Sequence, residues 1–331
     1  LIEPIGGDRL AITDAGRDLL AKLIIHSPDS QPEHSRPQPA PEPALDNTRT
    51  SSLQTTPSTA PSEPEDLPED REPSPVEVLA KKIRDASTDS KNPERLELAI
   101  RDAFQFLGFD AEKLGGSGKT DVLVKAPLGR DDSYSVAVDA KTVGAGSLGD
   151  GQVDWLTLDD HRKQHNADYS MLIGPNPSGS RLMNRAVDKS VAVLSTDQLA
   201  DLCIQHAGAP LGLESYRSLF ETGGAVDTSP IKNEAQNLTR LRELAAELLA
   251  TLVDQTRETG PLTARDLWLL LRSHPSVKAG SQQEIQQVLD TLASPLVGAI
   301  QGTGDKGYVL ATAPRVIQQR LQQLGDLLAA H

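Results

Sequence analysis

Two aspartates and a lysine on neighbouring strand-like segments are the residues of this sequence best suited to chemistry. Asp121 opens one apolar run, and Asp139 and Lys141 lie two positions apart at the end of the next. Because side chains alternate along a strand, Asp139 and Lys141 point to the same face of a sheet. If the hairpin between the runs is centred on residues 129–130, Asp121 lands beside Val138 and Asp139.

This trio has the chemistry needed to hydrolyse a phosphodiester. Two carboxylates on rigid strands can hold a hydrated Mg²⁺, which completes its coordination shell with water and a phosphate. A metal held in this way lowers the pKa of a bound water and neutralises the phosphate, while the lysine orients the water or the departing charge. The alternative is a surface pair, but Asp139 follows the apolar run YSVAV, where an unpaired carboxylate is costly.

The elements around the trio alternate between strand and helix patterns, which predicts an α/β core: a mixed sheet flanked by helices. One helix has an apolar stripe through Leu96, Ile100, Phe104 and Leu107, and it stops at Gly108. We expect strands at 121–125, 134–142, 169–175 and 191–196, and helices at 76–86, 96–107, 152–166 and 180–189.

The C-terminal part, residues 232–331, has the pattern of a separate α+β winged-helix domain. We expect helices at 238–255, 263–272, 281–293 and 314–330, with a strand, a glycine-rich turn and a second strand within 296–311. The third helix contains no Lys or Arg and carries Glu284 and Asp290, so it is poorly equipped to neutralise phosphates. Its glutamines could read adenine edges, and contact with a protein remains an equal alternative.

The N-terminal quarter differs from the rest in composition. Residues 1–26 resemble the strand, turn and closing helix of a truncated winged-helix-like module. Residues 27–75 hold just over half of the 23 prolines, with many Ser and Glu, which is typical of a disordered linker. The net charge of −14 excludes a uniformly basic nucleic-acid binder, although a modular one remains possible.

The central segment resembles a known family. The order of helix, glycine-rich loop, Asp, hairpin and D-x-K is similar to that of the PD-(D/E)xK nuclease superfamily. The strings LGGSGKTDVLV, VAVDAKT and GDGQVDW look most like the cleavage domains of FokI-type (type IIS) restriction endonucleases, with kinship to Mrr-like enzymes. The resemblance covers about residues 94–221 and implies a restriction-endonuclease-like core within 76–225.

The resemblance also implies roles for individual residues. Asp121 and Asp139 match the metal-binding carboxylates, and Lys141 matches the catalytic lysine. Glu97 matches the acidic residue of the first helix and is expected as a further metal ligand and catalytic residue. The sequence departs from the family at Thr120, where a proline often stands, and at the second acid, which is Asp rather than the commoner Glu.

Together these features predict an endodeoxyribonuclease that depends on Mg²⁺, with Mn²⁺ as a possible substitute, acting in restriction or another defence against foreign DNA. The resemblance implies a transient homodimer of the nuclease domain, and the winged helix is expected to contact DNA or a partner protein. Two alternatives stay open: a non-catalytic DNA-binding or assembly protein on a nuclease-like scaffold, and a repair or transposition nuclease.

Three other features carry less weight. The Gly118-Lys119-Thr120 string lacks the first glycine of a P-loop and precedes a strand rather than a helix. His161 and His165 have helical zinc spacing but no third ligand in the sequence pattern. The chain has a single cysteine and no apolar run of membrane-spanning length, so we expect a soluble, cytoplasmic protein.

Overall fold

The computed structural model describes residues 2–5, 9–12, 72–115, 120–274 and 280–329. At the N-terminus, β1 (Ile2–Ile5) and β2 (Arg9–Ile12) pair as an antiparallel hairpin. The helix expected after Thr13, nearly all of the expected linker and the glycine-rich residues 116–119 lie outside the described part of the chain.

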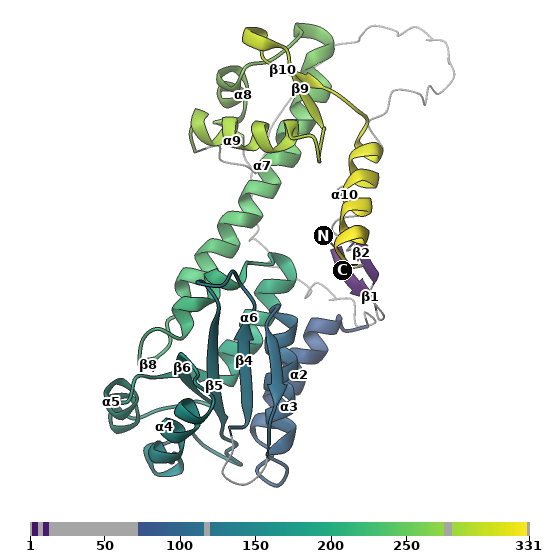
Figure 1. The fold of residues 1–331 in the computed structure, drawn as a ribbon. Helices are drawn as coiled ribbons and strands as arrows, with labels where there is room; N and C mark the ends of the chain where they lie inside the picture. Colours follow the sequence, from purple (N-terminus) through teal and green to yellow (C-terminus); the bar gives the residue numbers. More distant parts are fainter. Residues whose placement is uncertain (1, 6–8, 13–71, 116–119, 275–279, 330–331) are drawn as a thin grey trace, which may run out of the picture.

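A six-stranded mixed sheet lies at the centre of the fold, in the order β3-β4-β5-β6-β7-β8 (Figure 1). The pairs β3–β4 and β4–β5 are antiparallel, and the pairs from β5 to β8 are parallel. The strands are β3 (Asp110–Lys113), β4 (Val122–Ala126), β5 (Tyr134–Ala140), β6 (Tyr169–Gly174), β7 (Val191–Ser195) and β8 (Gly224–Ala225). The mixed sheet expected from the sequence is therefore confirmed.

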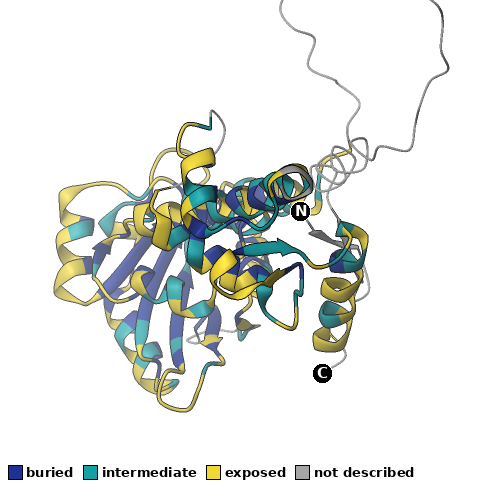
Figure 2. Cartoon of the chain, turned by 90° about the horizontal axis from the view of Figure 1, so that it is seen from above, coloured by how far each residue is buried: buried dark blue, intermediate teal, exposed yellow. Residues whose placement is uncertain are grey.

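Helices cover both faces of this sheet, and a hydrophobic core fills each side. Along β4, Val122 and Val124 enter the core beneath α2, α3 and α6, while Leu172 of β6 enters the core beneath α4 and α5. Figure 2 shows the buried strands between helices with exposed outer sides. The helices are α2 (Pro75–Ser87), α3 (Glu94–Phe106), α4 (Trp155–Gln164), α5 (Ser180–Asp188) and α6 (Thr196–Gly208), with 3-10 turns η1 (Asp150–Gln152) and η2 (Leu213–Leu219).

Most of the few aromatic residues in the chain pack together in the larger core. Phe109 lies near the middle of this cluster, with ring centroids 5.6 Å from Phe104 and 6.1 Å from Phe220, both edge-on. Tyr134 keeps its hydroxyl satisfied by donating to the Leu213 carbonyl at 2.7 Å. Edge-on contacts of this kind add stability beyond the area they bury. They fix β5, which carries Asp139, against α3 and η2.

The start of α6 is fixed by a capping box. The Ser195 hydroxyl accepts from Gln198 N at 3.0 Å, and the Gln198 side chain accepts from Ser195 N at 2.9 Å. We expect Ser195→Ala to lower the free energy of unfolding by about 1 kcal/mol, because the first turn loses an acceptor for an unpaired N–H. Urea unfolding of the full chain measures this, and Ser178→Ala, in an exposed loop, is the control. An unchanged free energy for Ser195→Ala would contradict the expectation.

The C-terminal part has a core of its own. It consists of α7 (Ser229–Thr259), α8 (Ala264–Leu271), α9 (Gln282–Ala293), the antiparallel hairpin β9 (Ile300–Gly302) and β10 (Tyr308–Leu310), and α10 (Pro314–Ala329), with a 3-10 turn η3 (Gly304–Lys306) in the hairpin. Ile231, in the first turn of α7, packs into the core of the central sheet, whereas Leu244, Leu248 and Leu252 pack into the C-terminal core. One continuous helix therefore joins the two cores (Figure 1).

Several elements differ from the sequence-based expectation. β3 was not predicted, because it contains one buried apolar residue, Ala111, and shows no apolar alternation. α6 was not predicted either, although Leu199, Leu202 and Cys203 are buried at helical spacing. α7 begins at Ser229 rather than near Leu238, since Ile231 in its first turn packs into the core of the central sheet and the helix contacts α6. The helix expected over 152–166 is shorter, with η1 before it. Among the described residues, no helix combines the length and apolarity needed to cross a bilayer.

Candidate functional site

The hairpin of β4 and β5 brings the two predicted aspartates together. Val122 pairs with Val138 in the antiparallel ladder, so the next position of the register places Asp121 directly opposite Asp139. The sequence predicted Asp121 beside Val138 and Asp139, and the observed register differs from that expectation by one residue. Asp121 and Asp139 alternate with the valines, so they share the sheet face that α4 and α5 cover.

Asp121 is held in place by the backbone of both neighbouring strands. Its Oδ2 atom accepts from Ala140 N at 2.8 Å, and its carbonyl oxygen accepts from Leu114 N at 3.0 Å. Burial, and after it the negative charge of Asp139, raise the pKa of Asp121 to about 6 against the opposing effects of the Ala140 N–H and Lys141. The nearby protein groups therefore do not fully compensate the negative charge of ionised Asp121.

Asp139 is buried and paired with the predicted lysine. Lys141 Nζ lies 2.5 Å from Asp139 Oδ2, and the Asp139 side chain is only 10% exposed. Despite this ion pair, the buried Oδ2 atom accepts no hydrogen bond of good geometry from any described group. A buried acceptor in this state retains the capacity to bind another partner.

The main chain at Lys141 is fixed by β6. Lys141 N donates to the Ile173 carbonyl at 2.8 Å, which extends the parallel ladder past the end of β5. Gly174 allows the close approach, because a Cβ there would lie 2.8 Å from the Lys141 carbonyl oxygen and 2.7 Å from Leu148 Cδ2. The lysine therefore projects from a rigid position beside Asp139.

Glu97 lies apart from the aspartate pair. It is on α3, which covers the opposite face of the sheet, and its Oε2 atom lies 3.4 Å from Lys113 Nζ on β3. Glu97 is close enough for its charge to contribute to the raised pKa of Asp121, as the smallest of the causes. Within the described ranges, no three His, Cys, Asp or Glu side chains are grouped closely enough to hold a metal.

The aspartate pair fits a hydrated divalent cation on its own. Carboxylate oxygens are the ligands that Mg²⁺ takes, and Mg²⁺ keeps several waters rather than requiring a full cage of protein ligands. Asp139 Oδ2 accepts no hydrogen bond of good geometry but lies in the ion pair with Lys141, and Asp121 has one oxygen outside its bond to Ala140. Such a cation would also compensate the two adjacent negative charges.

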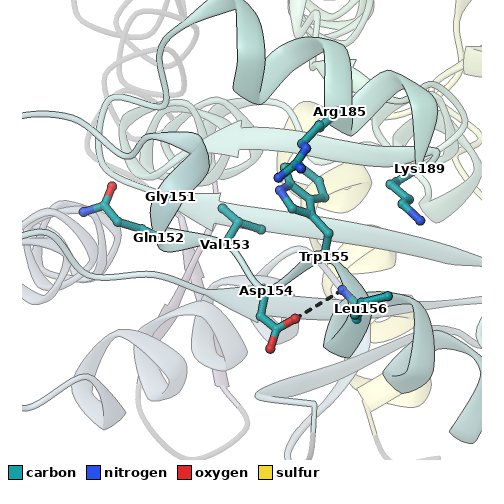
Figure 3. Close-up of a pocket in the computed structure, with 8 residues that line it drawn as sticks. All are labelled: Gly151, Gln152, Val153, Asp154, Trp155, Leu156, Arg185 and Lys189. Atoms are coloured by element: carbon teal, nitrogen blue, oxygen red, sulfur yellow. Dashed lines mark hydrogen bonds between the residues drawn. The ribbon is translucent and has the colours of Figure 1, made fainter.

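An open pocket of about 620 Å³ lies between η1, the start of α4 and α5 (Figure 3). Asp154 lines it and caps α4 by accepting from Leu156 N and Thr157 N. Hydrogen bonds from Thr157 lower the pKa of Asp154 most, and the charge of Lys141 lowers it weakly. Gln152 also lines this pocket, and its Oε1 atom accepts from Gly149 N.

Lys113 is a site neighbour that the sequence analysis did not identify. It lies on β3 beside the glycine-rich loop, pairs with Val122 in the ladder, and contacts Glu94 and Glu97 of α3. Only the side-chain geometry reveals it, because β3 has no distinctive pattern. Thr120, at the position of the family's proline, is buried, and its hydroxyl has no hydrogen-bond partner among the described groups.

Comparisons with known proteins add little to this geometry. No family model matches the chain, and no curated protein matches it. A solved structure of the restriction endonuclease FokI bound to DNA aligns with a TM-score of 0.37 and 18% identity, covering 47% of this chain and 34% of that one. The chain thus spans about a third of the length of FokI.

Proposed function

We propose that this chain is a metal-dependent endonuclease that hydrolyses phosphodiester bonds of DNA. The observation that carries the proposal is the placement of Asp121 opposite Asp139, with Lys141 paired to Asp139 on the same sheet face. The pKa of Asp121 is strongly raised, and perturbed pKa values of this kind gather at functional sites. The trio is therefore expected to bind a cation rather than to form a structural ion pair alone.

Each residue has a separate task in this proposal. Asp121 and Asp139 hold the cation, and the hydrogen bond from Ala140 N keeps the Asp121 carboxylate oriented toward it. A bound Mg²⁺ or Mn²⁺ supplies Lewis acidity and a more acidic water. Lys141, fixed through Ile173, presents its ammonium beside the scissile phosphate, where it orients the attacking water or stabilises the developing charge.

The C-terminal unit is proposed to be a winged-helix domain that positions the nuclease. Three helices, a β-hairpin and a closing helix, α7 to α10, follow one another in the order expected from the sequence. Glu284, which counted against contact with DNA, is neutralised by an ion pair with Arg240 of α7, and Asp290 accepts from Gln286 at 2.7 Å. These contacts reduce the electrostatic obstacle to DNA, while a protein partner remains the second possibility for this surface.

The remaining parts of the proposal concern biology and assembly. We propose a role in restriction or a related defence in the cytoplasm, because a nuclease core beside a recognition module suits sequence-directed cutting. The resemblance to FokI-type cleavage domains adds the proposal that two chains meet transiently to make a double-strand break.

The test is cleavage of supercoiled and linear DNA by the full chain, with Mg²⁺ or with EDTA. We expect nicking or cutting that requires the metal, and a decrease of about 10²-fold for Lys141→Met, because a positioned ammonium is lost from the reacting phosphate. Lys81→Met is the matched control, since Lys81 is exposed on α2 in an ion pair with Asp85 and lies outside the site.

Cleavage that continues in EDTA, or a Lys141→Met variant that cuts as fast as the wild type, would overturn the proposed function. Binding of DNA without cleavage at every Mg²⁺ and Mn²⁺ concentration would instead favour a scaffold without catalysis. The rates of the two lysine variants are compared at equal folded fraction, judged by circular dichroism.

A further inference from the structure

Two histidines of α4 end in buried nitrogen atoms that make no hydrogen bond. The Nε2 atoms of His161 and His165 are both buried, and neither has a hydrogen-bond partner among the described groups. His161 is only 5% exposed, and His165 is half-buried. Buried polar atoms of folded proteins nearly always have a partner, which can be a bound ion or an ordered water. The two imidazoles therefore keep the capacity to bind a ligand.

The helix places both imidazoles on one face. Residues four apart on a helix are neighbours, with Cβ atoms about 5–6 Å apart. His165 N donates to the His161 carbonyl at 3.2 Å, so helical hydrogen bonding is unbroken from one histidine to the other. Leu158, one turn before His161, lies in the core between α4 and the sheet, so His161 is on the side of α4 that faces the sheet. Two histidines at this spacing can bind one zinc ion.

The C-terminal end of α4, which carries the pair, is fixed by its own backbone. Asn166 has a φ of 47°, Asn166 N donates to the Lys163 carbonyl at 3.2 Å, and Ala167 N donates to the Arg162 carbonyl at 2.9 Å. These two bonds form a Schellman motif, which ends the helix directly after His165. The partial negative charge at the C-terminus of a helix also favours a cation.

The histidine pair is separate from the aspartate pair in place and in chemistry. Asp168 N, three residues after His165, donates to the Ser135 carbonyl at 3.0 Å, which ties this end of α4 to the start of β5. Asp139 lies four residues farther along β5, about 13 Å away. Imidazole nitrogens suit Zn²⁺, Ni²⁺ and Cu²⁺, whereas carboxylate oxygens suit Mg²⁺ and Mn²⁺. The two pairs therefore select different ions at opposite ends of the same strand.

We propose that His161 and His165 bind one zinc ion, which fixes the end of α4 against the sheet. Within the described ranges no group of three His, Cys, Asp or Glu forms a metal site, so water completes the coordination. Arg162 follows His161 where a catalytic H-E-x-x-H helix carries its glutamate, so the ion is structural rather than hydrolytic. This inference goes beyond the proposed function and does not depend on it.

The experiment titrates the full chain with Zn²⁺ by calorimetry, in excess Mg²⁺ to occupy carboxylate sites. We expect one Zn²⁺ per chain, and His165→Gln should bind it about tenfold more weakly or worse, since even outer partners of metal ligands contribute at least this much. Zn²⁺ should raise the Tm of the wild type and not that of the variant, because it binds the folded chain. Electron paramagnetic resonance with Cu²⁺ as the probe should show two nitrogen ligands in the wild type and one in His165→Gln.

His274→Gln is the matched control, because His274 lies in the C-terminal unit, with its Nε2 atom 3.3 Å from Glu247 Oε1. It should bind Zn²⁺ like the wild type. The inference is overturned if the wild type binds no Zn²⁺ in excess Mg²⁺, or if His165→Gln binds it equally well. His161→Gln should show the same loss, and His165→Gln alone decides if the more buried variant does not fold. A chain that cuts DNA with Mg²⁺ but fails these Zn²⁺ tests refutes only this inference.

Discussion

Asp121→Asn is expected to abolish most DNA cleavage and, at the same time, to make the protein more stable above pH 6. The loss of rate should reach about 10³-fold or more, because the variant lacks one of the two carboxylates proposed to hold the cation. The hydrogen bond from Ala140 N is retained, since an asparagine amide oxygen can accept it. The two measurements are a plasmid cleavage rate and urea unfolding at several pH values.

The stability effect follows from the raised pKa of Asp121. Its value of about 6 in the folded protein exceeds the ordinary 3.8, so the native state binds this proton more tightly than the unfolded chain. The free energy of unfolding therefore falls as the pH rises from about 4 to about 6, and the full cost persists above that range. Asparagine removes the cost, so we expect a gain of about 1–3 kcal/mol at pH 8 and none below pH 4.

Asp168→Asn serves as the control for a carboxylate outside the site, since Asp168 accepts from Ser135 N and Oγ at the far end of β5. Asp168→Asn should cleave DNA at the wild-type rate, and its free energy of unfolding at pH 8 should not exceed that of the wild type. An Asp121→Asn variant that is equally stable or less stable at pH 8 would show that its burial and its neighbour Asp139 do not raise the pKa. A variant that still cuts normally would remove Asp121 from the proposed chemistry.

Gly174→Ala is expected to lower the free energy of unfolding by about 3 kcal/mol and to reduce cleavage through Lys141. The added Cβ would lie 2.7 Å from Leu148 Cδ2 and 2.8 Å from the Lys141 carbonyl oxygen. Leu148 is completely buried, so its side chain cannot rotate into free space, and the carbonyl belongs to fixed backbone. The strain must therefore move Lys141 relative to Asp139.

Gly208→Ala is the matched comparison, because a Cβ at Gly208, in the last turn of α6, would meet nothing within 4 Å. It should change the free energy of unfolding by less than about 0.5 kcal/mol. Urea unfolding and cleavage rates of both variants are measured at the same folded fraction. Equal stability of the two variants would mean that the end of β6 packs more loosely than the burial of Leu148 indicates.

The aspartate pair could be predicted because its geometry is local. One hairpin separates Asp121 from Asp139, and strand alternation alone decides which side chains share a face. The one-residue error in register arose because the turn residues between the strands do not define a tight two-residue hairpin. The buried end of β5 was also recognisable, since its apolar run is continuous.

The surroundings of the pair could not be predicted in the same way. The contact of Lys113 with Glu97 joins β3 to α3, and the position of β3 follows from tertiary packing rather than from its own sequence. The start of α7 at Ser229 likewise depends on packing against α6, which no local pattern encodes. The sequence therefore predicted the aspartates and the lysine of the candidate site, while the structure revealed the tertiary contacts around them.

The length of α7 has a consequence for how the two halves of the molecule work together. A helix of 31 residues extends about 46 Å, and its two ends belong to different hydrophobic cores. A continuous helix transmits rotation as well as distance, so each residue inserted in its exposed middle would turn the C-terminal unit by about 100° around the helix axis. The helix therefore fixes the rotation of the C-terminal unit relative to the aspartate pair. The partner that the C-terminal unit binds would thus determine which phosphodiester the proposed site reaches.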